Sequence, residues 1–309
     1  IGVTGVQTCA LPICDQVIAQ VQTQSRYDQR REQVKAFNAS HKHRKRGLAL
    51  VPLKFGISFT ATHLNQGGAL LVIYMDGSVS VNHGGTEMGQ GLNTKMAQVC
   101  ADGLGIGIER VRVTATDSQK VPNASATSAS SGADINGAAI MNATAQMRER
   151  LQPVAAKLLG CQPHEVGFAN NAAHGGGRSV TWPELTKQAW LDRVGMSVTG
   201  FYMTPEIKYD FSTLSGRAFY YYCYGAAVSE VEIDTRTGEW WLRAVDIVHD
   251  VGQSINPAID RGQIEGAYVQ GMGWLTMEEC IWDQKGKLLT HGPSTYKIPV
   301  AGEIGRAHV

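Results

Sequence analysis

The chain has 309 residues, of which 43% are apolar and 18% charged, so it is long and apolar enough to bury a core and is not disordered in bulk. Its 28 Lys+Arg and 27 Asp+Glu nearly cancel, which argues against a protein that grips nucleic acid through a basic surface. No apolar run approaches the roughly 18 residues that cross a bilayer, so we expect no membrane association.

The two ends differ in character from the rest of the chain. Residues 1–14 and 303–309 resemble translated sequencing-adapter sequence, and we expect them to be a non-native leader and tail. Residues 15–302 would then be a single, partial native domain.

Hydrophobic periods and turn residues predict the elements between these ends. Residues 15–46 read as a surface helix whose solvated end is the polar run 41–46. Thr181 with Glu184 predicts a capped helix. The predicted elements after residue 46 are, in chain order, strands over 48–53 and 55–60, a hairpin of 69–74 and 78–81, a helix over 92–104, a strand over 111–115, a loop over 122–132, a helix over 133–159, the capped helix over 182–193, strands over 226–233 and 240–248, and a helix over 258–276.

This order favours an α+β fold, because the strands are grouped in hairpins rather than alternating strictly with helices. Each of two hairpins leads to a loop or helix that carries a Gln-Gly pair. We therefore expect two similar lobes around one site.

The six cysteines are scattered and form no Cys-x-x-Cys pair, which indicates buried reduced thiols and a cytoplasmic protein. The nine histidines are equally dispersed. We expect no direct protein ligands to a metal, so any metal would bring most of its ligands with it.

Two segments have the composition of ligand-binding loops. Residues 83–91 are rich in glycine and open a helix, which suits an anion but equally suits tight turns and close packing. Neither a Walker loop nor a dinucleotide fingerprint is present. Residues 123–132 are small and polar, the composition of a flexible linker or of a loop that wraps a large cofactor.

Read together, several ordered motifs resemble the molybdenum-cofactor portion of the xanthine dehydrogenase/oxidase family of molybdenum hydroxylases. The resemblance runs from about 47 to 300. Its strongest pieces are LysPheGlyIleSerPheThr (54–60), HisGlyGlyThrGluMetGlyGlnGly (83–91), SerGluValGluIleAsp (229–234), AspValGlyGlnSerIleAsnProAlaIleAsp (250–260) and GlyProSerThrTyrLysIlePro (292–299).

The resemblance implies roles for particular residues. Molybdenum would be held by molybdopterin, with the protein supplying surrounding contacts. The cofactor-binding positions would be Gly89, Gln90, Gly91, Ala129, Ser130, Gln270 and Gly271. Phe59 and Thr60 would form the wall of a purine pocket. The family reaction oxidises hypoxanthine and xanthine to uric acid with water as the oxygen source. Its 2Fe–2S clusters and FAD would lie on another domain or subunit of an oligomeric enzyme.

The chain departs from the family at its end. The family's catalytic glutamate lies in a GlyGluProPro motif, whereas Glu303 here is followed by Ile304 and Gly305 and comes too early. No catalytic residue is therefore assigned, and we expect the isolated chain to be inactive. Two alternatives stay open, an aldehyde oxidase-like molybdenum hydroxylase and a non-catalytic, glycine-rich nucleotide-binding or interaction domain.

Overall fold

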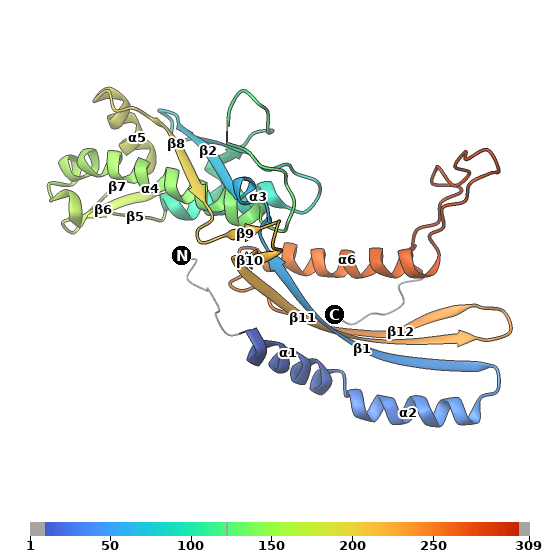
Figure 1. The fold of residues 1–309 in the computed structure, drawn as a ribbon. Coiled ribbons are helices and arrows are strands. Elements are labelled where there is room, and N and C mark those ends of the chain that lie inside the picture. The colour runs from blue at the N-terminus through green and yellow to red at the C-terminus, as the bar shows by residue number, and fades with distance from the viewer. Residues whose placement is uncertain (1–9, 122, 303–309) are drawn as a thin grey trace. The chain divides into compact units, whose positions relative to one another are not determined.

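The computed structural model describes residues 10–121 and 123–302, and it combines helices with several small sheets (Figure 1). The helices are α1 (Ala10–Gln24), α2 (Tyr27–Ser40), α3 (Leu92–Leu104), α4 (Gly132–Leu159), α5 (Trp182–Leu191) and α6 (Pro257–Thr276), with 3-10 turns η1 (Thr62–Leu64), η2 (Ile108–Arg110) and η3 (Pro163–Glu165). The strands are β1 (Arg44–Ile57), β2 (Gln66–Ile73), β3 (Val79–His83), β4 (Val111–Val113), β5 (Gly167–Ala169), β6 (Ala172–Gly175), β7 (Arg178–Thr181), β8 (Ser197–Met203), β9 (Lys208–Asp210), β10 (Ser215–Arg217), β11 (Tyr221–Asp234) and β12 (Trp240–His249). The predicted α+β class is confirmed.

The chain divides into two compact units, but not into sequential halves. One, the continuous unit, is Gly56–Tyr221. The other, the discontinuous unit, combines Ile1–Phe55 with Tyr222–Val309. Strand β1 ends just inside the continuous unit and β11 begins at its last residue. Both strands therefore lie almost entirely in the discontinuous unit.

The continuous unit is built on a four-stranded sheet in the order β4-β3-β2-β8. The predicted hairpin is confirmed, with β2 and β3 antiparallel and Ala69 opposite His83. Side chains alternate across a strand, so Ala69, Leu71 and Ile73 all enter the core on one face. Helix α4 packs against β2 and β8, and α3 packs against α4. Helix α3 has the bounds that its hydrophobic spacing predicts.

The contact between β8 and α4 is unusually close. A methyl group added at Gly200 of β8 would lie 2.0 Å from the carbonyl oxygen of Ala139 and 2.7 Å from the amide nitrogen of Ala143 in α4. Only a residue without a Cβ atom fits at this point. The strand backbone thus packs directly on the helix backbone.

The first residues of α5 pack into the same core. Thr181 Oγ1 accepts from the Glu184 N–H at 3.4 Å, and Glu184 Oε2 accepts from the Thr181 N–H at 3.0 Å, which confirms the predicted capping box. The next residue, Trp182, is fully buried, and its Nε1–H donates to the Gly77 carbonyl at 2.9 Å. Two smaller sheets, β5-β6-β7 and β9-β10, complete this unit.

The discontinuous unit is a three-stranded sheet in the order β1-β11-β12 with helices on both faces (Figure 1). On one face, Val17 and Val21 of α1 pack with Tyr224 of β11. On the other face, Met272 of α6 packs with Leu242 of β12. Burial of both faces explains why β11 is long and rich in apolar residues.

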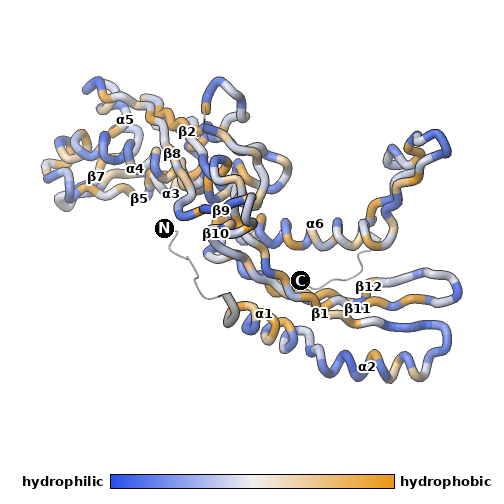
Figure 2. Tube along the Cα trace, viewed as in Figure 1, coloured by the Kyte–Doolittle hydropathy of each residue, from blue (hydrophilic) through white to orange (hydrophobic). Residues whose placement is uncertain are grey.

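The prediction for residues 15–46 was wrong in two respects. The segment forms two helices that are separated at Arg26, which has a left-handed φ of 52°, and the second helix ends at Ser40. The polar run 41–46 is not the end of a helix, because β1 already begins at Arg44. Helix α2 is nevertheless mostly hydrophilic along its length (Figure 2).

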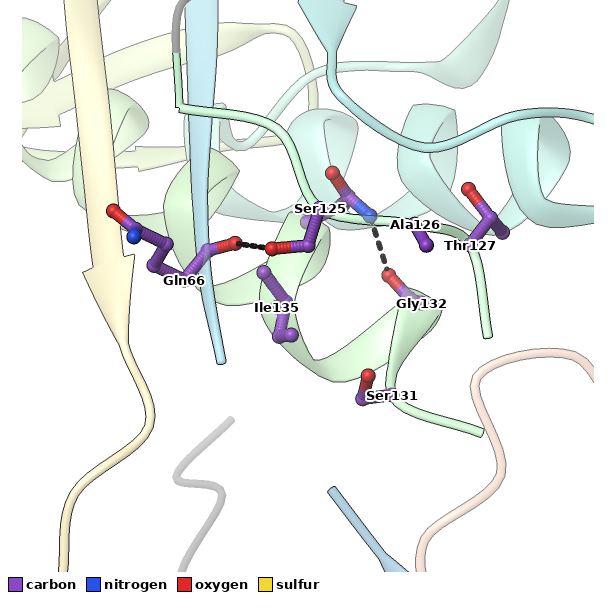
Figure 3. A pocket seen from close by; sticks show the side chains of 8 residues that line it. Gln66, Ser125, Ala126, Thr127, Ser131, Gly132 and Ile135 are labelled. Carbon is purple, nitrogen blue, oxygen red and sulfur yellow. Dashed lines mark hydrogen bonds between the residues drawn. The ribbon is translucent and has the colours of Figure 1, made fainter. Parts of the chain in front are cut away.

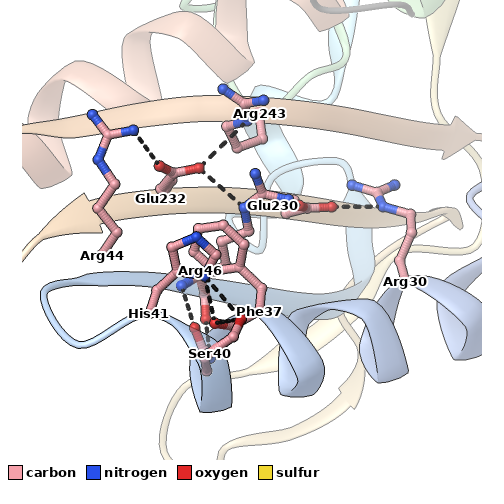
Figure 4. A network of polar contacts seen from close by, with 10 residues as sticks. Arg30, Phe37, Ser40, His41, Arg44, Arg46, Glu230, Glu232 and Arg243 are labelled. Atoms are coloured by element: carbon pink, nitrogen blue, oxygen red, sulfur yellow. Dashed lines mark hydrogen bonds and ion pairs between the residues drawn. The ribbon is translucent and has the colours of Figure 1, made fainter.

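The physical reason for this difference is a set of ion pairs across the sheet (Figure 4). Arg44 and Arg46 lie two residues apart on β1 and bond Glu232 of β11, at 3.3 Å and 3.0 Å. Arg30 of α2 reaches Glu230 at 2.9 Å. Because Glu232 is only 3% exposed, the arginines of the polar run compensate a buried charge, and residues 44–46 become strand.

The cysteine prediction held for only part of the set. The five cysteines among the described residues are free; Cys100 is buried, Cys14, Cys161 and Cys223 are half-buried, and Cys280 is exposed. Cys9 lies outside the described residues. Burial raises the pKa of the Cys100 thiol to about 12. Across residues 10–121 and 123–302, no helix is both long and apolar enough to cross a membrane.

Candidate functional site

The glycine-rich loop between β3 and α3 is organised by Glu87. Its Oε1 accepts from the N–H groups of Gly89 and Gly91, at 2.9 Å and 3.0 Å, and its Oε2 accepts from the N–H of Asn93 at 2.9 Å. Although burial acts in the opposite direction, the amides of Asn93, Gly91 and Gly89 hold the pKa of Glu87 below its usual value. This exposed carboxylate therefore occupies amides that the sequence suggested for a bound anion.

Gln90, the predicted cofactor residue of the same loop, is held in place by the loop itself. Its Oε1 accepts from the Met88 N–H at 2.6 Å, and its Nε2 donates to the Thr86 carbonyl at 2.9 Å. A side-chain amide offers two N–H donors and two acceptor positions. Each end of the Gln90 amide thus retains capacity for one further hydrogen bond.

The base of this loop is a buried histidine. The Gly85 N–H donates to His83 Nδ1 at 3.1 Å, so the neutral ring carries its proton on Nε2, which lies 3.1 Å from Asn93 Oδ1. Burial lowers the pKa of His83, which favours this neutral form. His83 therefore joins the two ends of the loop and is not placed as a metal ligand.

The second predicted loop, residues 123–132, lies against the first. Thr127 Oγ1 accepts from the Thr86 N–H at 2.8 Å. A methyl group added at Gly84 would lie 2.7 Å from the Ala124 Cβ atom, so the two loops are in close contact. The linker interpretation of residues 123–132 is therefore less consistent with the structure than a packed loop.

Ala129 and Ser130 have an unusual backbone in this second loop. Both are non-glycine residues with left-handed φ angles, 54° and 55°. Among the described residues, neither of their N–H groups has a hydrogen-bond acceptor. Strained residues with unused donors are a feature of ligand-binding loops.

A small pocket opens near these residues, at the start of α4 (Figure 3). Ser125 Oγ donates to the Gln66 carbonyl at 3.1 Å on one side of it. The lining residues are Gln66, Ser125, Ala126, Thr127, Ser131, Gly132, Ile135 and Asn136. Hydroxyl and amide groups line the pocket together with the apolar side chains of Ala126 and Ile135, and it has room for about one water molecule.

The predicted substrate wall adjoins the second loop. The N–H of Ser58 donates to the Ala129 carbonyl at 3.4 Å, immediately before the half-buried Phe59 and Thr60. Through this bond and the Thr86 to Thr127 bond, the continuous unit brings together all three of its predicted segments. Sequence spacing alone gives no indication of this proximity, because the segments are about 30 to 70 residues apart.

Gln270 and Gly271, the remaining predicted positions, belong to the discontinuous unit. They lie on α6, which begins where Asn256 Oδ1 accepts from the Ile259 N–H at 3.0 Å. Gln270 is exposed, and a methyl group at Gly271 would meet no atom within 4 Å. This part of the helix surface is thus open within its own unit.

Sequence reasoning missed three residues that shape the site, namely Glu87, Asn65 and Thr127. Glu87 stands inside the quoted glycine motif, and its position five residues before the helix was the available signal. Thr127 acts on the backbone of a segment 41 residues away, which leaves no pattern in the sequence. Asn65 bonds the backbone of Phe59 six residues before it, a spacing that no turn or capping rule singles out. In residues 10–121 and 123–302, no cluster of three or more His, Cys, Asp or Glu could hold a metal ion.

The free donors around these loops suit a bound group that accepts hydrogen bonds. The unused N–H groups of Ala129 and Ser130 and the second N–H of Gln90 can donate to it. Gly89 has a φ of +96°, and a methyl group there would meet no atom within 4 Å, so a ligand can approach the backbone closely. The contribution of Gly89 is therefore access rather than donation, since its N–H bonds Glu87.

Comparisons with known proteins agree with this chemistry. Residues 20–305 match the sequence profile of the family described as molybdopterin cofactor-binding domain. The xanthine dehydrogenase/oxidase of Mus musculus is 48% identical over 95% of this chain and 20% of its own length. The xanthine dehydrogenase of Blastobotrys adeninivorans is 47% identical over 92% of this chain and 19% of its own length. The chain thus spans about one fifth of these relatives.

Solved structures share the fold at lower identity. Quinoline 2-oxidoreductase from Pseudomonas putida 86 is 24% identical with a TM-score of 0.78, and covers 94% of this chain and 38% of its own. A Cu,Mo-CO dehydrogenase is 21% identical with a TM-score of 0.80, and covers 95% of this chain and 38% of its own. At these identities the likeness concerns the fold alone.

Proposed function

Because the chain belongs to the molybdopterin cofactor-binding domain family, we propose that it forms part of a molybdenum hydroxylase that oxidises hypoxanthine and xanthine to uric acid. The observation that carries this proposal is the meeting of the Gln90 loop, the Ala129–Ser130 loop and the Phe59–Thr60 segment in one place. The high identity to two xanthine-oxidising relatives supports the substrate, and it makes an aldehyde oxidase-like activity the weaker candidate.

The proposed cofactor is molybdenum–molybdopterin, which supplies a redox-active metal and an oxygen that comes from water. Ala129 and Ser130 would donate backbone N–H groups to it, Gln90 would add a side-chain donor, and Gly89 and Gly91 would allow close approach. Gln270 and Gly271 of α6 are proposed as further contacts. These residues bind and orient the cofactor, and none of them is assigned a proton-transfer role.

Phe59 and Thr60 are proposed as the substrate contacts. An aromatic ring prefers an offset or edge-on partner, so Phe59 would fix the plane of a purine ring. The Thr60 hydroxyl can donate to, or accept from, a ring substituent. The bond from Ser58 to Ala129 joins this wall to a cofactor loop, so substrate and cofactor would be held by one connected piece of backbone.

The complete enzyme requires more than this chain. We propose that 2Fe–2S clusters and FAD lie on other domains or subunits, that the enzyme is oligomeric, and that it is cytoplasmic. The general base is also proposed to come from outside the matched region. Glu303 was not assigned as this base, because it does not match the family's motif. It lies outside the described residues, as do residues 1–9 and 304–309. Residues 10–14 form the first turn of α1.

The test is to extend the gene at both ends, purify the full-length protein, and measure molybdenum content and xanthine-dependent urate formation. We expect molybdenum to be bound and urate to form, and we expect the 309-residue chain alone to form none. Phe59→Ala in the full-length protein should raise KM for xanthine. Phe211→Ala, which removes a phenylalanine ring that is 60% exposed, should leave it unchanged. Molybdenum-free protein, or protein without urate formation, would disprove the proposal.

A further inference from the structure

The side chain of Asn65 makes a two-way hydrogen bond with the backbone of Phe59. Asn65 Oδ1 accepts from the Phe59 N–H at 2.8 Å, and Asn65 Nδ2 donates to the Phe59 carbonyl at 2.8 Å. Asn65 is only 1% exposed, so these bonds are shielded from water. The side chain acts toward Phe59 as a neighbouring strand would, supplying one donor and one acceptor to one residue.

Asn65 is itself fixed to the main sheet. Its carbonyl accepts from the Thr204 N–H at 2.9 Å, and the following residue, Gln66, begins β2 opposite Met203 of β8. The position of Asn65 is therefore set by the four-stranded sheet, and its side chain transmits that position to Phe59.

The Phe59–Thr60 segment has few other restraints. Strand β1 ends at Ile57, and Ser58 has a φ of 127°, which is sterically strained for a residue with a side chain. The hydrogen bonds of Ser58 are long: its N–H donates to the Ala129 carbonyl at 3.4 Å, and its Oγ accepts from the Tyr220 N–H at 3.4 Å. The Asn65 bonds are the shortest ones that hold the segment.

We infer that Asn65 is a positioning residue that sets the place of the Phe59 ring and the Thr60 hydroxyl, and thereby the affinity for a ring-shaped substrate. This inference rests on the proposed function, in which Phe59 and Thr60 contact the substrate. An amide is required because the site needs a donor and an acceptor on one short side chain. Aspartate keeps the acceptor for the Phe59 N–H but places a second acceptor against the Phe59 carbonyl.

The chain contains a matched control for this test. Asn38 makes the same two-way bond to the backbone of Arg46, with Nδ2 donating to the carbonyl at 2.9 Å and Oδ1 accepting from the N–H at 2.7 Å. Asn38 lies in the discontinuous unit and bonds no proposed site residue. Asn38→Asp therefore makes the same chemical change to the same type of contact without touching the substrate wall.

The experiment compares Asn65→Asp and Asn38→Asp in the full-length enzyme, by steady-state kinetics with xanthine and by thermal unfolding. We expect Asn65→Asp to raise KM about tenfold, the equivalent of about 1.4 kcal/mol, with a smaller change in kcat. Both variants should lower the unfolding temperature, but Asn38→Asp should leave KM unchanged. An unchanged KM in Asn65→Asp, or an equal rise in both variants, would overturn the inference.

A second measurement separates this inference from the proposed function. Amide hydrogen exchange of peptides that contain Phe59 reports the order of the segment without any substrate. We expect faster exchange there in Asn65→Asp and no change in Asn38→Asp. If the unmodified enzyme forms no urate, the proposed substrate is wrong, whereas unchanged exchange at Phe59 shows that Asn65 does not order the segment.

Discussion

Replacing Glu87 by glutamine probes whether one carboxylate organises the glycine-rich loop. Both oxygens of Glu87 are used, Oε1 by Gly89 and Gly91 and Oε2 by Asn93. In the Glu87→Gln variant, one of these oxygens becomes an NH₂ group. If the amide oxygen remains with the two glycines, the NH₂ group faces the Asn93 N–H, and two donors then oppose each other.

The expected size of the effect follows from these contacts. Loss of a side-chain acceptor at a helix N-terminus typically costs about 0.5–2 kcal/mol. Loss of the negative charge near the start of α3 adds about 0.3–1 kcal/mol. Because Glu87 is exposed and its N–H partners can turn to water, we expect the lower part of the combined range, about 1 kcal/mol.

Urea unfolding of the 309-residue chain measures this value, with Glu184→Gln as the matched control. Glu184 also caps a helix, but its two bonds to Thr181 use only Oε2. A glutamine oxygen can replace that atom, so we expect the Glu184→Gln variant to lose clearly less stability than Glu87→Gln. Equal losses in the two variants would show that the second oxygen of Glu87 is unimportant and that the reasoning is wrong.

The pH dependence of stability in the unmodified chain and in Glu87→Gln tests the electrostatic contribution of Glu87. The pKa of Glu87 is lower in the folded chain than its ordinary value of 4.5. Its contribution to stability is therefore fully present above that value and is lost as pH falls through the lower folded-state pKa. The stability difference between the unmodified chain and Glu87→Gln should shrink at acidic pH, and a difference that grows on acidification would contradict the assignment.

Three further predictions concern parts of the chain away from the loops. Gly200→Ala should destabilise the chain by about 1–3 kcal/mol in urea unfolding, because the new methyl group would meet the α4 backbone; Gly167→Ala, where a methyl group meets no atom within 4 Å, should cost far less. The Arg236 side chain lowers the pKa of Asp234 to about 2. In Asp234→Asn, the free energy of unfolding should therefore fall less steeply between about pH 4 and pH 2, and an unchanged slope would refute this. An alkylating reagent at about pH 8 should modify the exposed Cys280 quickly and the buried Cys100 only after denaturation. Mass spectrometry of digests measures both rates, and rapid labelling of Cys100 in folded protein would contradict its burial.

Local elements could be predicted where the pattern and the packing agree. The hairpin of β2 and β3 and the helix α3 follow directly from alternation, turn residues and helical spacing. The capping box at Thr181 is a contact within four residues, so sequence contains all of it. Such elements depend on neighbours in the chain and need no knowledge of the rest of the fold.

The predictions failed where a distant segment decides the outcome. Residues 44–46 became strand because β11 brings Glu232 next to Arg44 and Arg46, about 190 residues away. The site shows the same limit. Its loops could be singled out by composition and by resemblance, but the bond of Thr127 to Thr86 is a tertiary contact between segments 41 residues apart. Asn65 lies only six residues from Phe59, yet no turn or capping rule pairs a side chain with the backbone at that spacing.

The interrupted course of one unit has a consequence for how the polypeptide is made. Strand β1 is complete at Ile57, yet its sheet neighbour β11 starts only at Tyr221, roughly 160 residues later. At translation rates of about 5–20 residues per second, the nascent chain carries an unpaired strand edge for about ten to thirty seconds. Residues 56–221 are contiguous and can fold on the ribosome during that interval. Co-translational chaperones that shield exposed strands should therefore matter more for residues 44–57 than for a strand such as β2, whose partner β3 follows within ten residues.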